Sequence, residues 1–308
     1  MVIHKQIHGG GKLFRKDLFL LMVMSLVLLA SCNQTLDDGG SSATASDAIP
    51  LAPTLQSWAT RSTNPEPPPL TTDPAPNQSM APDSGWQEVR QGLERRVINL
   101  NDEDEDSTQS FYLLRIDPDL YRFNVGYHPG EARSLLNWGE ETEALIVVNG
   151  GYFTEDNHAT GLVISEGVSS GSTYLGFGGM FSVGTEGPTL RWLQQQPYDE
   201  TEPLSAAVQS FPMLITPGGK LGYKDETGEK ARRTVVAIDQ DGLILLIISP
   251  SATFTLADLG RYLINSDLNL DRALNLDGGA STGLLLADPL EGIPAFSELP
   301  SVLLVYPK

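Results

Sequence analysis

The segment Thr234-Val-Val-Ala-Ile-Asp-Gln-Asp-Gly-Leu-Ile-Leu-Leu-Ile-Ile248 contains two apolar runs that are separated by Asp239-Gln-Asp-Gly242. Aliphatic and β-branched residues favour extended backbone, and a short connection rich in Asp and Gly is typical of a tight turn between strands. The segment therefore predicts a β-hairpin, and it gives the chain a β-rich centre.

Similar runs lie on both sides of this hairpin. Further strands are predicted at 93–100, 111–117, 121–127, 162–165, 189–193, 206–215, near 274, at 284–286 and at 302–306. Two segments have helical spacing instead, 133–142 and 255–264, and Thr253 or Thr255 is placed to cap the second. Many strands with two helices indicate an α+β class, with a mixed, largely antiparallel sheet in a single globular domain.

Two of the apolar runs end in the same way. Ala144-Leu-Ile-Val-Val is followed by Asn149-Gly150-Gly151, and Ala273-Leu-Asn-Leu is followed by Asp277-Gly278-Gly279. Glycine has no Cβ, so it permits a sharp turn or the close approach of a ligand to the backbone. Strand ends of this kind are where domains display working polar groups, although Asn-Gly and Asp-Gly also form simple turns.

Residues 1–31 have the features of a signal peptide. Basic residues precede the apolar run 18–30, which is too short for an ordinary membrane span. The run ends at Leu29-Ala-Ser-Cys32, which resembles the lipobox of bacterial lipoproteins. The expectation is a lipid anchor at Cys32 that holds the protein in a bacterial cell envelope, facing the periplasm or the exterior. The alternative is a chance Cys after an ordinary signal peptide.

The next segment, residues 32–85, is rich in Ser, Thr, Pro, Asp and Ala. Such a composition buries too little apolar surface to offset the entropy of ordering it. It predicts a disordered tether between the anchor and a globular domain of residues 86–308.

The charge balance excludes one broad class of partner. The 308 residues contain 20 Lys and Arg against 39 Asp and Glu, a net charge of −19. A surface this acidic argues against nucleic acid, which needs a basic footprint. The acidic run 101–106 could bind calcium, but it lacks the ligand spacing of an EF-hand, and a solvated turn is the alternative.

Several catalytic chemistries are excluded by the residues present. Cys32 is the only cysteine, and no paired-histidine zinc motif occurs. The glycine-rich stretch 171–184 lacks the pattern of a nucleotide loop, so turns explain it better. A Ser-His-Asp set that uses Ser281 or Ser210 with His158 stays open, but carboxylate chemistry is favoured.

Four motifs occur in a characteristic order. They are Val147-Val-Asn-Gly-Gly-Tyr-Phe153, Gln209-Ser-Phe-Pro212, Arg232-Arg-Thr-Val-Val-Ala237 and Leu276-Asp-Gly-Gly-Ala-Ser-Thr282. Together they resemble the phosphodiester glycosidase family over roughly residues 110–308. The resemblance implies a hydrolase that cleaves the bond between a sugar C1 and a phosphodiester oxygen, acting on an envelope or extracellular glycan.

The resemblance also suggests roles for individual residues. Asp277 would be the catalytic carboxylate, as nucleophile, base or electrostatic partner of a positive charge at C1. Arg233, with Arg232, would hold phosphate oxygens in fork geometry, and Asn149 would orient the substrate. The other expected substrate-binding residues are Gly150, Gly151, Gln209, Ser210, Gly278, Gly279, Ser281 and Thr282. No metal ligand is expected in this site and no cofactor is expected to be required, calcium at the acidic run being the one metal considered.

Two departures from the family pattern bear on activity. Ala280 and Ala237 stand where the family commonly has Gly, and Ala280 would block substrate if its position needed a positive φ. Simpler interpretations also stay open: Arg233 could pair with Asp239 or Asp241, and Glu166 could be a second carboxylate or only a turn. The competing function is a non-catalytic module that binds phosphorylated glycans.

Overall fold

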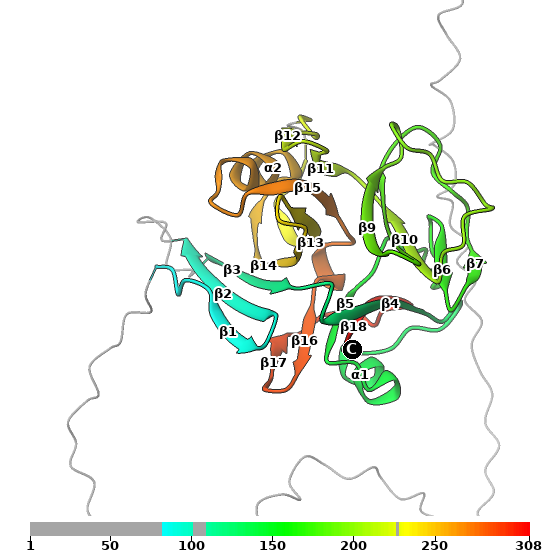
Figure 1. The fold of residues 1–308 in the computed structure, drawn as a ribbon, viewed down its shortest axis with the longest axis horizontal. Helices are drawn as coiled ribbons and strands as arrows, with labels where there is room; N and C mark the ends of the chain where they lie inside the picture. Colours follow the sequence, from blue (N-terminus) through cyan, green and yellow to red (C-terminus); the bar gives the residue numbers. More distant parts are fainter. Residues whose placement is uncertain (1–81, 101–108, 226–227) are drawn as a thin grey trace, which may run out of the picture. The chain divides into compact units, whose positions relative to one another are not determined.

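The computed structural model describes residues 82–100, 109–225 and 228–308. The signal peptide, Cys32, nearly all of the tether and the acidic run 101–106 lie outside the described residues. The described residues form three sheets and two α-helices, and every strand pairing that the three sheets contain is antiparallel (Figure 1). The predicted α+β class is confirmed, with three sheets in place of the one that was expected.

The largest sheet has eight strands in the order β1-β2-β3-β14-β13-β15-β11-β12. Their bounds are β1 Gln87–Arg90, β2 Leu93–Leu100, β3 Gln109–Ile116, β11 Met213–Thr216, β12 Lys220–Leu221, β13 Ala231–Asp239, β14 Ile244–Phe254 and β15 Leu270–Asn275. The predicted hairpin is the β13–β14 pair at the centre of this sheet. Its turn is closed by the Asp239 carboxylate, which accepts hydrogen bonds from the backbone N–H groups of Asp241 and Leu243.

Two five-stranded sheets complete the domain, in the orders β7-β6-β10-β8-β9 and β17-β16-β5-β18-β4. The first comprises β6 Val163–Ser165, β7 Val168–Ser170, β8 Gly179–Gly184, β9 Gly187–Trp192 and β10 Ala206–Ser210. The second comprises β4 Tyr121–Tyr127, β5 Ile146–Asn149, β16 Leu284–Ala287, β17 Leu290–Ile293 and β18 Ser301–Pro307.

Both predicted helices are present. They are α1 Leu135–Thr142 and α2 Leu256–Asn265, and a short 3₁₀ turn, η1, spans Gly279–Ser281. Thr255 caps α2 by accepting a hydrogen bond from the Asp258 N–H. The buried face of α2 includes Leu259 and Leu263, which pack on the large sheet, and each such side chain contributes roughly 1.5–3 kcal/mol on burial.

One predicted strand is wrong. Residues 206–215 are almost continuously apolar, yet the structure divides them into β10 and β11, which belong to different sheets. The division falls at Phe211–Pro212, a cis peptide. Pro212 has no N–H to donate to a ladder, so the strand cannot continue through it. The chain therefore passes at Pro212 from the five-stranded sheet that contains β10 to the eight-stranded sheet that contains β11.

A single core joins the three sheets. The central cluster includes Val236 from the eight-stranded sheet, Phe181 and Val208 from the sheet that contains β10, and Ile146 and Leu303 from the sheet that contains β5. All five side chains are essentially inaccessible to solvent. A core shared in this way is typical of one domain.

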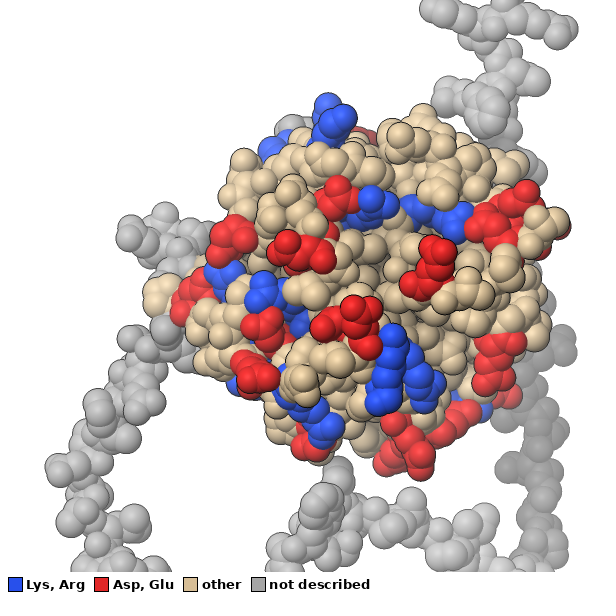
Figure 2. Space-filling model, in the orientation of Figure 1, with Lys and Arg blue, Asp and Glu red and all other residues tan. Residues whose placement is uncertain are grey.

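The described surface carries both signs of charge. Figure 2 shows Lys and Arg interspersed with Asp and Glu on one face, with no extended basic area. Within the described residues, no helix is both long and apolar enough to cross a membrane.

Candidate active site

The two Gly-Gly strand ends are in direct contact. Asn149, at the end of β5, donates a hydrogen bond from Nδ2 to the Asp277 carbonyl at 2.8 Å. Its Oδ1 accepts bonds from Thr234 Oγ1 at 2.7 Å and from the Gly283 N–H at 3.1 Å. One side chain therefore fastens the end of β5 to β13 and to the segment between β15 and β16.

The structure gives Asn149 partners within the protein, where a contact with substrate was predicted. The residue is 0% exposed, and the protein itself occupies both polar atoms of its side chain. Asn149 is a positioning residue that fixes the backbone of Asp277. Asn149 ends the paired strand β5, as both the functional and the simpler interpretation expected.

Asp277 is the half-buried carboxylate of the cluster. Burial raises its pKa above the ordinary value, and hydrogen bonding from Ser281 and from the Gly278 N–H opposes that shift. The Gly278 N–H lies 2.8 Å from Asp277 Oδ1. The Asp277 N–H donates to the Gly150 carbonyl at 3.1 Å, so the backbone on both sides of the carboxylate is fixed. A carboxylate held in this way, with a raised pKa, is a common feature of functional sites.

Arg233 lies beside the Asp277-Gly278 turn. Its Nε donates to the Phe254 carbonyl at 3.3 Å and its Nη2 to the Glu229 carbonyl at 2.5 Å. Nη1 lies 3.7 Å from the position that a Cβ on Gly278 would occupy. The predicted fork geometry therefore needs correction, because two of the three guanidinium nitrogens hold backbone carbonyls and Nη1 is left for a ligand.

Arg232 packs against a different segment. Its Nε donates to Pro250 O and its Nη2 to Pro294 O, while Nη1 is buried without a hydrogen-bond partner. The guanidinium carbon lies 4.0 Å from the centre of the Phe296 ring. Burial lowers the pKa of both Arg232 and Arg233, and within the described residues neither makes an ion pair. Asp239, a predicted partner of Arg233, closes the β13–β14 turn instead.

The glycines serve close packing more than ligand approach. A Cβ on Gly150 would lie 2.4 Å from Ser301 Oγ, and one on Gly151 would lie 2.7 Å from Gln209 O. The Gly150 N–H donates to Ser301 O, and the Gly278 N–H is used by Asp277. These two N–H groups are therefore already bonded within the protein, where contacts with substrate were expected. Gly279 differs, since its φ is +61° and no atom lies within 4 Å of where its Cβ would be.

The two departures from the family pattern cause no strain. Ala280 is exposed within η1 and is not among the residues with positive φ, so its methyl group is tolerated by the backbone. Ala237 is buried in the core beneath α2, away from the Asp277 turn. Neither position demands glycine in this structure.

The remaining predicted residues divide into two groups. Gln209 is buried, and its side-chain amide bonds the loop before β8. It accepts a hydrogen bond from the Tyr174 N–H at 2.7 Å and donates one to Thr173 Oγ1 at 2.8 Å. Its predicted contact with substrate is therefore replaced by a structural role. Ser210 and Thr282 are fully buried with hydroxyls that have no hydrogen-bond partner, and Ser281 Oγ lies 3.3 Å from Ser297 Oγ.

Two residues of the cluster were missed by sequence reasoning. Asn275 Nδ2 donates to Tyr152 Oη at 2.8 Å and to Phe211 O at 3.0 Å. Burial, with the nearby charge of Asp277, raises the pKa of Tyr152 to about 12, so its phenol is protonated at neutral pH. Tyr152 belongs to the motif 147–153. Asn275 is two residues before Asp277, a spacing that places both side chains on one face of an extended segment.

Other candidates lie elsewhere or lose their support. Glu166 forms the β6–β7 turn with φ of +51°, as the simpler interpretation had it. Among the described residues, no group of three His, Cys, Asp or Glu could hold a metal ion. The predicted calcium run lies outside the described residues.

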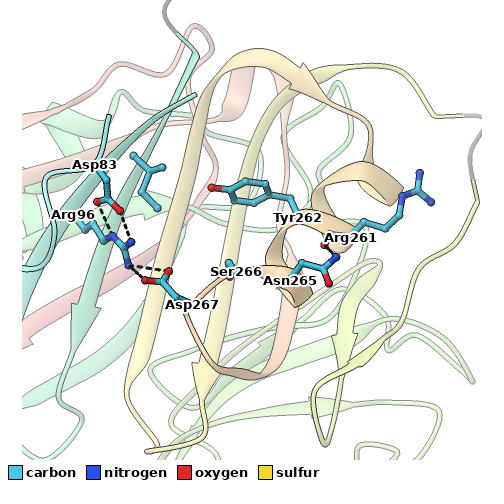
Figure 3. Close-up of a pocket in the computed structure, with 8 residues that line it drawn as sticks. Asp83, Arg96, Arg261, Tyr262, Asn265, Ser266 and Asp267 are labelled. Carbon is cyan, nitrogen blue, oxygen red and sulfur yellow. Dashed lines mark hydrogen bonds and ion pairs between the residues drawn. The ribbon is translucent and has the colours of Figure 1, made fainter. Parts of the chain in front are cut away.

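A cavity of about 550 Å³ lies between β2 and α2, lined by Asp83, Arg96, Ile98 and residues of α2 and the turn after it (Figure 3). Arg96 is saturated there, because Asp83 and Asp267 both bond its guanidinium. None of the predicted site residues lines this cavity. The chemistry therefore points to the Asp277 cluster and away from this cavity.

The fold and the site together define a largely antiparallel α+β domain in which the half-buried Asp277 and the guanidinium of Arg233 lie at the same turn. The sequence model of the phosphodiester glycosidase family matches residues 142–306, more than half of the chain, and the protein belongs to this family. No relative among the curated proteins matches the sequence.

Two solved structures are similar to this chain, and the first of them shows a shared fold. The catalytic domain of zebrafish N-acetylglucosamine-1-phosphodiester alpha-N-acetylglucosaminidase, auto-inhibited by its pro-peptide, is 19% identical, with a TM-score of 0.57 over 70% of this chain and 84% of that chain. A hypothetical protein from Synechocystis is 15% identical, with a TM-score of 0.49 over 71% of this chain and 62% of that chain.

Proposed function

We propose that the protein hydrolyses the bond between the anomeric carbon of a sugar and the oxygen of a phosphodiester. The observation that carries the proposal is Arg233 Nη1, which lies beside the Asp277-Gly278 turn without a carboxylate partner. Buried arginines are almost always paired, so guanidinium groups with a free nitrogen and no carboxylate partner fit an anionic ligand. A phosphodiester supplies that anion, and its sugar carbon would then lie near the Asp277 carboxylate.

Each residue has a role in this reaction. As the C1–O bond breaks, a positive charge develops at C1. The ionised Asp277 stabilises this charge or attacks C1 as a nucleophile. The departing phosphate monoester takes the electron pair of that bond, and Arg233 Nη1 stabilises its charge. Tyr152 is protonated and accepts from Asn275, which leaves its own proton for a sugar or phosphate oxygen. Water finally adds to C1 and releases the free sugar.

Isotope labelling tests the reaction and the bond that breaks. The substrates are methyl diesters of glucose, galactose, mannose and N-acetylglucosamine 1-phosphates, as both anomers, in ¹⁸O-water. The proposal expects ¹⁸O in the released sugar and none in methyl phosphate. Label in the phosphate would identify cleavage of the P–O bond and contradict a glycosidase.

A non-catalytic module that binds phosphorylated glycans is the second candidate. It is favoured by the position of Glu166, which forms a turn and so removes the second carboxylate that many glycosidases need. Binding of a panel diester with no release of sugar over many hours would support this module.

Arg233→Lys tests the anion-binding role. Lysine keeps the positive charge but cannot hold Phe254 O and Glu229 O while it reaches the ligand. Loss of one charge-assisted hydrogen bond predicts a fall in kcat/KM of roughly 10- to 100-fold. The matched control is Arg122→Lys at an exposed position of β4, where the guanidinium lies over the Tyr306 ring and a change within about twofold is expected. Equal effects of the two variants would remove Arg233 from the site.

The pH profile tests the state of Asp277. Because burial raises its pKa above the ordinary 3.8, and because the ionised form is the reactive one, kcat/KM should fall on the acid side at a pH above 3.8. Ser281→Ala removes a hydrogen bond that lowers this pKa, so the acid limb should move to still higher pH. An acid limb at or below 3.8 that Ser281→Ala does not move would show that another group is titrating.

We also propose that Cys32 is lipidated and holds the protein in a bacterial cell envelope. The support is the sequence of residues 1–32, which lies outside the described residues. In a bacterial host, wild-type protein should sediment with membranes, and Cys32→Ser should leave most of it in the soluble fraction. Sedimentation of both forms with membranes in equal amounts would contradict the anchor.

A further inference from the structure

Exposed aromatic rings gather on the loop before β8 and at the end of β10. Phe177 and Phe211 are 48% and 40% exposed, and their ring centres are 5.9 Å apart at an interplanar angle of 72°. Tyr174 stacks on Phe177 at 4.7 Å, and the neighbouring Leu175 is 82% exposed. These four side chains are called the aromatic patch. Contiguous exposed apolar groups of this kind commonly mark a binding surface.

The patch is continuous with the Asp277 cluster. The Tyr152 ring lies 4.7 Å from the Phe211 ring. Asn275 Nδ2 bonds both the Tyr152 hydroxyl and the Phe211 carbonyl. The charge of Asp277 acts on the Tyr152 phenol, so Tyr152 joins the patch to the Asp277 cluster.

The patch is held in place by a buried amide. Gln209 accepts from the Tyr174 N–H and donates to Thr173 Oγ1, and Tyr174 Oη lies 3.1 Å from Thr160 Oγ1. Gln209 is 1% exposed, so these bonds offset the desolvation of its amide. The loop that carries Phe177 is thus a fixed surface, which suits recognition of a rigid ring.

The potential of aromatic rings indicates which part of a glycosyl phosphodiester the patch would bind. In a glycosyl phosphodiester the phosphate lies between C1 of the sugar and the aglycone, and in the proposed function Arg233 binds this phosphate. Among the described residues, no Arg or Lys lies over a ring of the patch, whereas Arg232 lies over Phe296. Aromatic faces carry negative potential and repel phosphate, but they accept the C–H face of a neutral ring.

We propose that the aromatic patch binds the apolar face of the sugar ring whose C1 meets Asp277. This assignment rests on the proposed glycosidase function. Phe177 and Leu175 supply the outer part of the surface, and Phe211 joins it to Tyr152. Recognition of the sugar by ring contact makes the patch a specificity-determining element of the site.

The test uses Phe177→Ala and Leu175→Ala with Leu290→Ala as the matched control. Leu290 is 75% exposed on β17, outside the patch. The substrates share the panel sugar that is hydrolysed fastest and carry either a methyl or an octyl aglycone. Phe177→Ala should raise KM about tenfold and by the same factor for both, with kcat changed less than about twofold. Leu175→Ala should raise KM less, and Leu290→Ala should leave it unchanged.

The outcomes separate this inference from the proposed function. A larger KM effect on the octyl substrate would place the aglycone on the patch and overturn the inference, as would turnover that Phe177→Ala does not alter. If no substrate is hydrolysed, calorimetry with the methyl diesters decides: binding that Phe177→Ala weakens about tenfold supports the patch although hydrolysis has failed. Binding that Phe177→Ala does not affect, or no binding at millimolar diester, overturns it.

Discussion

Asp277→Asn should reduce the release of free sugar on the order of 10³-fold or more. The substitution is nearly isosteric, and the new Oδ1 can still accept the Gly278 N–H that the carboxylate accepts at 2.8 Å. What it removes is the negative charge that would stabilise or attack C1, and losses of single catalytic carboxylates in hydrolases are of this order or larger. Initial rates on the fastest panel diester measure the effect.

The stability of the same variant shows whether the loss is chemical. The raised pKa means that the folded state disfavours the ionised carboxylate, so Asp277 lowers the free energy of unfolding once the pH is above its unfolded pKa. Asn does not ionise. Asp277→Asn should therefore be at least as stable as the wild type at pH 7, and any gain should disappear as the pH falls below the unfolded pKa.

A matched control is available in the β3–β4 turn. Asp119 is exposed there, and Asp119→Asn should keep wild-type activity and stability. If Asp277→Asn retains more than about a tenth of the wild-type rate, the catalytic assignment of Asp277 is wrong. In that case another residue carries the hydrolysis, and Asp277 has a structural role in the cluster.

Local chemistry made part of the fold predictable. The hairpin from Thr234 to Ile248 follows from two apolar runs and an Asp/Gly turn, all within a few residues of one another. The cap of α2 follows in the same way from Thr255. The separation of β10 from β11 was missed. The nearly continuous apolar run predicted one strand, and the single proline within it was not taken as its end.

Some site residues could likewise be predicted from nearby sequence, and others depended on distant contacts. Composition and motif order single out Asp277 and Arg233, and the structure brings both to one cluster. The same reasoning assigned Asn149 to the substrate, since an amide at a strand end gives no indication of its partner. That partner is the Asp277 carbonyl, 128 residues further along the chain. Whether a polar side chain serves a ligand or the backbone is decided by such distant contacts.

Asn149→Ala should be among the most destabilising single substitutions in the domain. The amide is 0% exposed and bonds Thr234 Oγ1, the Gly283 N–H and the Asp277 carbonyl. Removing it leaves buried backbone groups without partners, at roughly 1–3 kcal/mol each. The expected loss in the free energy of unfolding is about 3–5 kcal/mol, a large part of the total that a domain of this kind has. Denaturant unfolding followed by circular dichroism measures it.

Two further variants separate the contribution of the network from that of the residue type. Asn265→Ala, on the exposed end of α2, removes one bond to the Arg261 carbonyl and should cost less than about 0.5 kcal/mol. Thr234→Val removes only the Asn149–Thr234 bond and should cost about 1 kcal/mol. The double variant of Asn149 and Thr234 should lose less than the sum, because the two residues share that bond.

The same residue links stability to catalysis. Asn149 holds the backbone of Asp277, so in the fraction of Asn149→Ala that stays folded the carboxylate is no longer fixed relative to Arg233. We therefore expect kcat to fall more than KM rises, since a misplaced carboxylate affects the transition state more than ground-state binding. A variant that unfolds normally but only loses substrate affinity would instead return Asn149 to the role of a substrate contact.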